Sequence, residues 1–275
     1  MKTDVERRED GSIILRITIP WSEVKEVRSE IEKELLKNLS IPGFRKGKAP
    51  QNVAKQKIDK EKLKEETIRK VLPDHYFKAL KEHSINPIIN PKINIQTFEE
   101  DKDVVFTAET AEEPKIDLNN YKEKVKEITA KSKIIVPGKE QKKPSIEEIL
   151  DVIHENTTIN IPKLLIDQET DRLLIQLLDE LKTLGVNLDQ YLSSKAKTAD
   201  DLRKEYEEKA KRDLKTEFVL KKIADEEKIT VEKKDIDEAL NTIKDEAQKQ
   251  EITKNPYLIA AIIRQQKTIN FLLNL

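Results

Sequence analysis

Short stretches rich in β-branched residues, each bounded by proline, glycine or acidic residues, predict strands in the first 111 residues. These stretches are a strand that begins near Val5 and residues 12–20, 88–89, 93–98 and 104–108. Asp10-Gly11 has the composition of a tight hairpin turn between the first two strands, and the acidic residues 99–103 join the last two. Consecutive strands joined in this way predict an antiparallel sheet.

Apolar residues that recur every three or four positions predict two helices in the same region. The first begins at Ser22, a favourable N-cap residue, and runs to about Leu39. Its buried face consists of Val24, Val27, Ile31 and Leu35. The second covers residues 53–82 and is broken or kinked at Pro73. We therefore predict that residues 1–111 form an α+β domain, with helices packed on the antiparallel sheet.

The pattern changes twice in the rest of the chain. Residues 112–144 are rich in proline and lysine, which predicts an extended linker with one strand near residues 134–136. From Ser145 onward the pattern is helical, beginning with a capping box formed by Ser145 and Glu148. The predicted helices cover residues 146–155, 162–184 (with Pro162 first and a stop at Gly185), 199–227, 235–250 and 256–275. Residues 145–275 are thus predicted to be an all-α domain with long helical arms, one of them roughly 40 Å long.

The composition excludes several classes of function. The chain has 52 Lys/Arg, 53 Asp/Glu, only 4% aromatic residues and no cysteine, so disulfides and thiolate chemistry are excluded and few side chains suit a small-molecule pocket. The three histidines, His75, His83 and His154, lack a second ligand at metal spacing, so we predict no metal, no other cofactor and no catalytic residue. No run of about 18 apolar residues and no apolar signal region occur, and we therefore expect a soluble, cytoplasmic protein without a membrane partner.

Positive charge is concentrated in one window, residues 35–58, which contains six Lys/Arg and no Asp or Glu. Within it lies Gly43-Phe44-Arg45-Lys46-Gly47-Lys48-Ala49-Pro50, where glycine and proline predict a stiff loop that exposes one aromatic ring and several cations. Cations bind phosphates and aromatic rings stack on bases, so the loop predicts a docking point for a polyanion. RNA is the first candidate. The alternative is an ordinary turn with solvated lysines and a buried Phe44.

The same residues resemble a known family. Residues 1–111, with the loop at 43–50 and with Ile85-Asn86-Pro87 further on, resemble the ribosome-binding N-terminal domain of trigger factor, a bacterial chaperone of the ribosomal exit tunnel. Residues 145–275, which include Ile159-Asn160-Ile161-Pro162-Lys163-Leu164-Leu165-Ile166-Asp167, resemble its helical C-terminal chaperone domain. The resemblance implies that the ribosome, through tunnel-exit protein and ribosomal RNA, is contacted by Gly43, Phe44, Arg45, Lys46, Gly47 and Lys48.

One departure from the family changes the expected activity. The family usually carries a peptidyl-prolyl isomerase domain of the FK506-binding type between these two parts. Residues 112–144 are too few for such a domain and contain a single aromatic residue, Tyr121, whereas a proline pocket is lined by aromatic rings. We therefore predict that the chain is not an enzyme and has no prolyl isomerase activity.

The last predicted helix carries a broad aliphatic stripe, which is either packed against other helices or partly exposed to unfolded clients. The candidate client-binding residues are Leu258, Ile259, Ile262, Ile263, Ile269 and Leu272. We predict an ATP-independent chaperone that docks at the ribosome and transiently shields hydrophobic segments of nascent or unfolded polypeptides. The alternatives are a ribosome-independent assembly or export chaperone and, less favoured, a residual prolyl isomerase. The sequence leaves open whether the free protein forms a homodimer.

Overall fold

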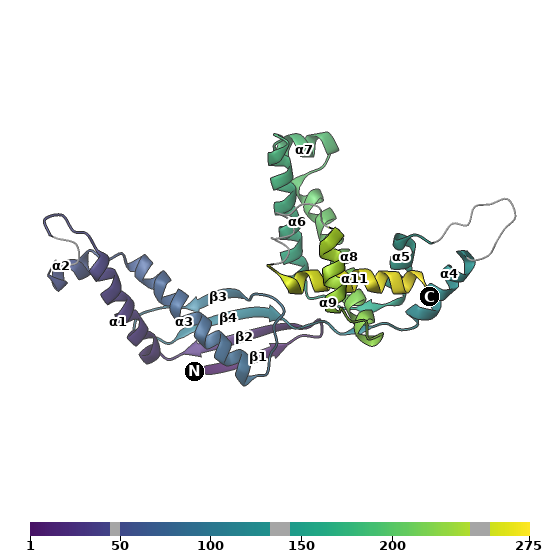
Figure 1. The fold of residues 1–275 in the computed structure, drawn as a ribbon. Coiled ribbons are helices and arrows are strands. Elements are labelled where there is room, and N and C mark those ends of the chain that lie inside the picture. The colour runs from purple at the N-terminus through teal and green to yellow at the C-terminus, as the bar shows by residue number, and fades with distance from the viewer. Residues whose placement is uncertain (45–49, 133–143, 243–253) are drawn as a thin grey trace. The chain divides into compact units, whose positions relative to one another are not determined.

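The structure, a computed structural model, describes residues 1–44, 50–132, 144–242 and 254–275. The chain forms two compact units, Met1–Glu113 and Pro114–Leu275, which we call unit 1 and unit 2. Unit 1 contains a sheet with helices, and unit 2 is almost entirely helical (Figure 1). The predicted fold class, α+β followed by a mostly helical region, is confirmed.

Unit 1 is built on a four-stranded antiparallel sheet with the strand order β1-β2-β4-β3. The strands are β1 (Lys2–Arg7), β2 (Ser12–Ile19), β3 (Lys92–Thr97) and β4 (Val104–Ala111). β1 and β2 form the predicted hairpin, in which Val5 lies opposite Leu15, and Gly11 adopts φ +88° in the turn. β2 pairs on its other edge with β4, which places Ile17 opposite Phe106 and closes the sheet between distant parts of unit 1.

One face of this sheet is the core of unit 1, because side chains alternate between the two faces of a strand. The buried residues are Ile13, Leu15, Ile17 and Ile19 of β2 and Val104, Phe106 and Ala108 of β4. Helix α3 (Lys60–Glu82) lies across this face (Figure 1) and contributes Val71, Leu72, Tyr76, Ala79 and Leu80. Full burial of each large aliphatic or aromatic side chain contributes roughly 1.5–3 kcal/mol, so this layer is the main source of stability in unit 1.

Helix α1 (Trp21–Asn38) begins two residues earlier than the predicted N-cap at Ser22 allows. Pro20 occupies the N-cap position, and Ser22 lies inside the helix instead of capping it. The free N–H of Trp21 is bound by a side chain from the β3–β4 turn, since it donates to the Asp103 carboxylate with an N···O distance of 3.1 Å. The start of α1 is therefore fixed to the end of the sheet by a contact between residues far apart in sequence.

The second predicted helix is divided, but not at the proline. Helix α2 (Gln51–Gln56) ends before residues 57–59, and α3 then continues through Pro73 without a break. The division arises because the Asp59 side chain accepts hydrogen bonds from the N–H groups of Glu61 and Lys62 and so caps a new helix. Residues 88–89 are not a strand; Ile88 donates one backbone hydrogen bond to Ala111 beside the sheet.

Unit 2 consists of helices with one small two-stranded sheet, β5–β6. Its elements are β5 (Ile116–Asp117), α4 (Tyr121–Ser132), α5 (Ile146–Asn156), β6 (Thr158–Ile159), α6 (Lys163–Thr183), α7 (Leu188–Lys195), α8 (Ala199–Glu226), α9 (Lys233–Thr242) and α11 (Pro256–Leu273). The predicted capping box is present, with Ser145 and Glu148 exchanging hydrogen bonds of 2.9 and 3.1 Å. Gly185 adopts φ +70° where α6 ends, as predicted, while Pro162 is the N-cap residue of α6 and not its first helical residue.

The predicted extended linker over residues 112–144 is wrong for most of its described part. Residues 116–117 form β5 and residues 121–132 form α4, whose Tyr121 and Val125 are buried in the core of unit 2. They pack with Ile149 and Ile153 of α5, Val219, Leu220 and Ile223 of α8, and Leu272 of α11. The spacing of four between Tyr121, Val125 and Thr129 is the helical signal that the proline and lysine content obscured. The strand predicted near residues 134–136 lies outside the described residues.

Candidate functional site

The basic loop between α1 and α2 is described on its two flanks. Ile41 is buried, whereas Gly43 is exposed and Phe44 is 44% exposed. The N–H of Phe44 donates a hydrogen bond to the carbonyl of Ile41, with an N···O distance of 3.0 Å. Gly43 has φ +87°, a backbone conformation that favours glycine. The preference comes from the backbone and not from crowding, because a Cβ at this position would meet no atom within 4 Å. Phe44 is therefore not part of the local core. Four other predicted docking residues lie outside the described residues: Arg45, Lys46, Gly47 and Lys48.

The helices at the base of this loop are joined by ion pairs. Lys55 of α2 lies 3.4 Å from the carboxylate of Glu32 on α1, and Lys70 of α3 lies 3.3 Å from Glu30 on α1. Solvent-exposed pairs of this kind contribute at most about 1 kcal/mol each. The pairs therefore contribute only a small part of the stability of unit 1.

A cleft of about 1070 Å³ opens in unit 2 between α5, α6, α8 and α11. Leu220 and Ala224 of α8 line it and are almost fully buried, while Ile146 of α5 and Leu258 and Ile262 of α11 line it and are about half exposed. The cleft thus combines a buried aliphatic surface with exposed aliphatic side chains. Such a surface can contact apolar side chains of another polypeptide without forming an enclosed pocket.

The candidate client-binding residues of α11 divide between the surface and the core. Leu258 and Ile262, one turn apart, are each 54% exposed and line the cleft. Ile259 is 6% exposed and Leu272 is fully buried among α4, α5 and α8, so the prediction that these two contact clients is wrong. Ile269 packs against the same core, and Ile263 is half-buried. The stripe is wider than one helix face, which is why its two sides have different surroundings.

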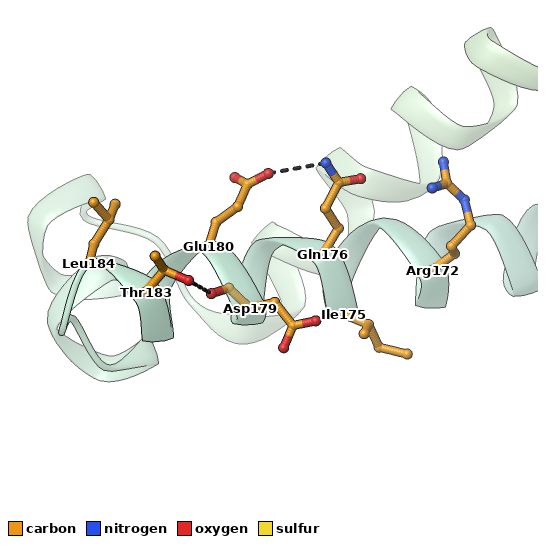
Figure 2. Close-up of a pocket in the computed structure, with 7 residues that line it drawn as sticks. All are labelled: Arg172, Ile175, Gln176, Asp179, Glu180, Thr183 and Leu184. Carbon is orange, nitrogen blue, oxygen red and sulfur yellow. Dashed lines mark hydrogen bonds between the residues drawn. The ribbon is translucent and has the colours of Figure 1, made fainter. Parts of the chain in front are cut away.

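A second groove, of about 680 Å³, follows one side of α6 (Figure 2). It is lined by Arg172, Ile175, Gln176, Asp179, Glu180, Thr183 and Leu184. Ile175 is 59% exposed and Leu184 75% exposed, whereas the next stripe of α6, Leu173, Leu177 and Leu181, is buried. Arg172 lines both this groove and the cleft. The sequence predicted this helix without assigning it a role; the signal for an exposed apolar side is that Ile175 does not share the spacing of the buried leucines.

The arginines that line the cleft are already neutralised by carboxylates within unit 2. Arg172 makes two hydrogen bonds to Glu169, of 2.6 and 2.8 Å, and this carboxylate raises the pKa of Arg172. Arg212 lies 2.7 Å from Asp151, and Arg264 lies 2.6 Å from Asp225. These arginines are therefore poorly suited to binding an anion, and the apolar side chains are the cleft's free contact groups.

The three histidines have structural partners. His75 is buried between the carbonyl of Val71 and the carboxylate of Glu23, and this contact lowers the pKa of Glu23. The Nε2 atom of His83 lies 2.7 Å from the hydroxyl of Thr3. Among the described residues no group of three His, Cys, Asp or Glu side chains is arranged to hold a metal ion. Within the same residues no helix is both long enough and apolar enough to cross a membrane.

His154 predicts a pH dependence of the stability of unit 2. Its Nε2 atom is 2.9 Å from the Thr216 hydroxyl, and its pKa is lowered by burial first and then by Lys215 and Arg212, while Asp151 opposes the shift. A histidine with a lowered folded-state pKa binds fewer protons folded than unfolded. Its contribution is therefore complete above the unfolded pKa of about 6.5 and is lost as pH falls through the folded pKa.

We expect His154→Gln to reduce the fall in unfolding free energy between pH 7.5 and 5.5. Urea unfolding followed by far-UV circular dichroism at several pH values measures this, and Trp21 fluorescence follows unit 1 separately because the chain has a single tryptophan. Other titrating groups act equally in both proteins, so the difference isolates His154. An identical pH profile for the wild type and the variant would contradict the assignment.

Protein-family models match residues of both units. The model of the bacterial trigger factor protein matches residues 1–149, and the model of its C-terminus matches residues 117–274. The chain belongs to the bacterial trigger factor family. The two matches overlap over residues 117–149, so no unmatched segment remains between them, and no isomerase domain is found there. This member of the trigger factor family joins the N-terminal and C-terminal parts directly.

Individual trigger factors match less than half of the chain. The trigger factor of Macrococcus caseolyticus is 35% identical over 122 residues, covering 44% of this chain and 29% of the relative. That of Pelotomaculum thermopropionicum is 34% identical over 123 residues, covering 45% of this chain and 28% of the relative. The matched segments thus span less than a third of these trigger factors.

A solved structure shows the same fold over the whole chain. It comes from work on promiscuous substrate recognition in folding and assembly activities of the trigger factor chaperone. The TM-score is 0.65 at 15% sequence identity, and the match covers 100% of this chain and 99% of the other. At this identity the likeness concerns the fold alone, and it agrees with the two family matches.

Proposed function

We propose that this chain is an ATP-independent chaperone of the bacterial cytoplasm. It docks on the ribosome at the tunnel exit through residues 43–50 and transiently shields hydrophobic segments of nascent or unfolded polypeptides. The observation that carries the proposal is the exposure of Phe44 beside Gly43 in a basic loop of a trigger factor N-terminal domain. An exposed aromatic ring next to several cations is costly to keep in water and suits contact with ribosomal protein and RNA together.

The shielding role is supported by the cleft and the α6 groove of unit 2. Both expose aliphatic side chains, namely Leu258 and Ile262 in the cleft and Ile175 and Leu184 in the groove. Exposed apolar side chains gathered in a cleft or groove often mark an interaction site. The contacts are open on one side and therefore weak and fast, which suits a client that has to leave as it folds.

Two measurements on the wild-type protein test the proposal. Co-sedimentation with ribosomes at about 50 mM and 200 mM salt should show binding that weakens as salt rises. Aggregation of a chemically unfolded model client should be delayed in the absence of any nucleotide. Loss of pelleting with retained protection would instead support the ribosome-independent assembly or export chaperone, and failure of both would overturn the proposal.

We further propose that the chain has no prolyl isomerase activity, because its trigger factor parts are joined without an intervening domain. In a proline-limited peptide or refolding assay, the rate with this protein is expected to equal the uncatalysed rate, which has a time constant of tens to hundreds of seconds. An FK506-binding-type isomerase at the same concentration provides the positive control. Catalysis well above background would support the residual isomerase.

A further inference from the structure

The flanks of the docking loop carry three lysines in described positions, and they differ in their partners. Lys37 lies in the last turn of α1, Lys55 in α2, and Lys57 at the end of α2, and all three are exposed. Lys55 is ion paired with Glu32. Lys37 and Lys57 have no carboxylate within ion-pair distance among the described residues, and residues 45–49 contain no acid. Two cations beside the loop are therefore available for a partner.

Three of the nearby acids bind other partners in unit 1. Glu30 and Glu32 bind Lys70 and Lys55, and Asp59 accepts backbone hydrogen bonds as the N-cap of α3. Glu34, one turn before Lys37, makes no ion pair with it. None of these acids is ion paired with Lys37 or Lys57 among the described residues. A cation that is unpaired and solvated can neutralise a phosphate without first breaking an internal contact.

We propose that Lys37 and Lys57 extend the docking surface beyond the loop by contacting the phosphate backbone of ribosomal RNA. The inference rests on the proposed ribosome docking and adds its partner chemistry at two residues outside the loop motif. Lysine acts as a compact point charge and suits a phosphate chain that passes at varying angles. Each such contact releases counterions from the RNA, so it contributes to the salt dependence of binding as well as to affinity.

The salt dependence of ribosome affinity tests the inference. Dissociation constants are measured at several KCl concentrations for the wild type and for the double variant Lys37→Gln/Lys57→Gln. The slope of log K against log[salt] should become shallower by roughly 0.7–0.9 for each lysine removed. The control is Glu32→Gln/Lys55→Gln, which removes an ion pair at the same helices without changing net charge and should keep the wild-type slope.

The outcomes separate this inference from the proposed function. If the wild type does not bind ribosomes, both are overturned. If the wild type binds through Phe44 but the lysine variant keeps the wild-type slope and affinity, docking stands and the inference is wrong. Lower affinity at an unchanged slope would assign the lysines to a protein contact and overturn the RNA assignment. Both lysines also end helices, where cations stabilise the dipole, but that role would change the unfolding free energy and not the slope.

Discussion

Ribosome affinity is expected to fall about a hundredfold when Phe44, Arg45 and Lys46 are replaced together by alanine. An aromatic or arginine anchor at the centre of an interface typically contributes about 2 kcal/mol or more, and the variant removes an aromatic ring and two charges at once. Phe44 is 44% exposed in a surface loop, so the unfolding free energy should change by less than about 0.5 kcal/mol. Co-sedimentation and urea unfolding of the same preparation measure the two effects.

Phe77 provides the matched control for this variant. It is an exposed phenylalanine of the same unit, 58% exposed on α3, and it lies outside the basic window. Phe77→Ala should therefore pellet like the wild type. Equal pelleting of the triple variant and the wild type would remove the loop from the docking surface, whatever the wild-type affinity.

Protection of an unfolded client is expected to require roughly ten to thirty times more protein when Leu258 and Ile262 are both replaced by serine. Each side chain is half exposed in the cleft, and partial burial of two aliphatic side chains against a client contributes roughly 2 kcal/mol together. The structure should persist, because neither residue belongs to the core of unit 2. Light scattering of an aggregating client over a range of chaperone concentrations measures the shift.

Two further replacements in α11 show whether the effect belongs to the cleft. Tyr257→Ser removes a side chain that is 87% exposed and does not line the cleft, so protection should stay unchanged. Leu272→Ala creates a cavity in the core and should cost about 2–5 kcal/mol of unfolding free energy, unlike the surface variant. If the Leu258 and Ile262 variant protects as well as the wild type, the client surface lies elsewhere, with the α6 groove as the next candidate.

The parts of the fold that could be predicted were those decided by neighbouring residues. The alternation of β2, the Asp10-Gly11 hairpin, the Ser145–Glu148 capping box and the stop at Gly185 all depend on short-range geometry. The errors arose where a helix boundary is determined by a residue distant in sequence or by a weaker local signal. Trp21 begins α1 because Asp103 binds its N–H from another part of unit 1, and the cap at Asp59 divided a helix that Pro73 does not.

For the candidate site, sequence could identify residue types but not which of them face solvent. The aliphatic residues of α11 look equivalent along the chain, yet Ile259 is buried beside the exposed Leu258 because they lie on different sides of the helix. Helix α4 was not predicted because it has few apolar positions, and these lie among lysines. Packing against α5 and α8 stabilises the helix, which would be marginal by itself. The proposed contact role of α6 could not be inferred without knowing which side of the helix α8 covers.

The core of unit 2 also has a consequence for the synthesis of this chain. All residues of unit 1 have been translated once Glu113 has emerged. In unit 2, Val125 and Ile153 can be fully buried only after Leu272 has been translated, near the end of synthesis. Until then the helices before α11 carry an uncovered aliphatic surface of the kind that makes folding intermediates aggregate. Unit 1 can therefore fold during translation while the C-terminal half stays incomplete. A protein that we propose to cover unfolded polypeptides is thus itself prone to aggregate during its own synthesis.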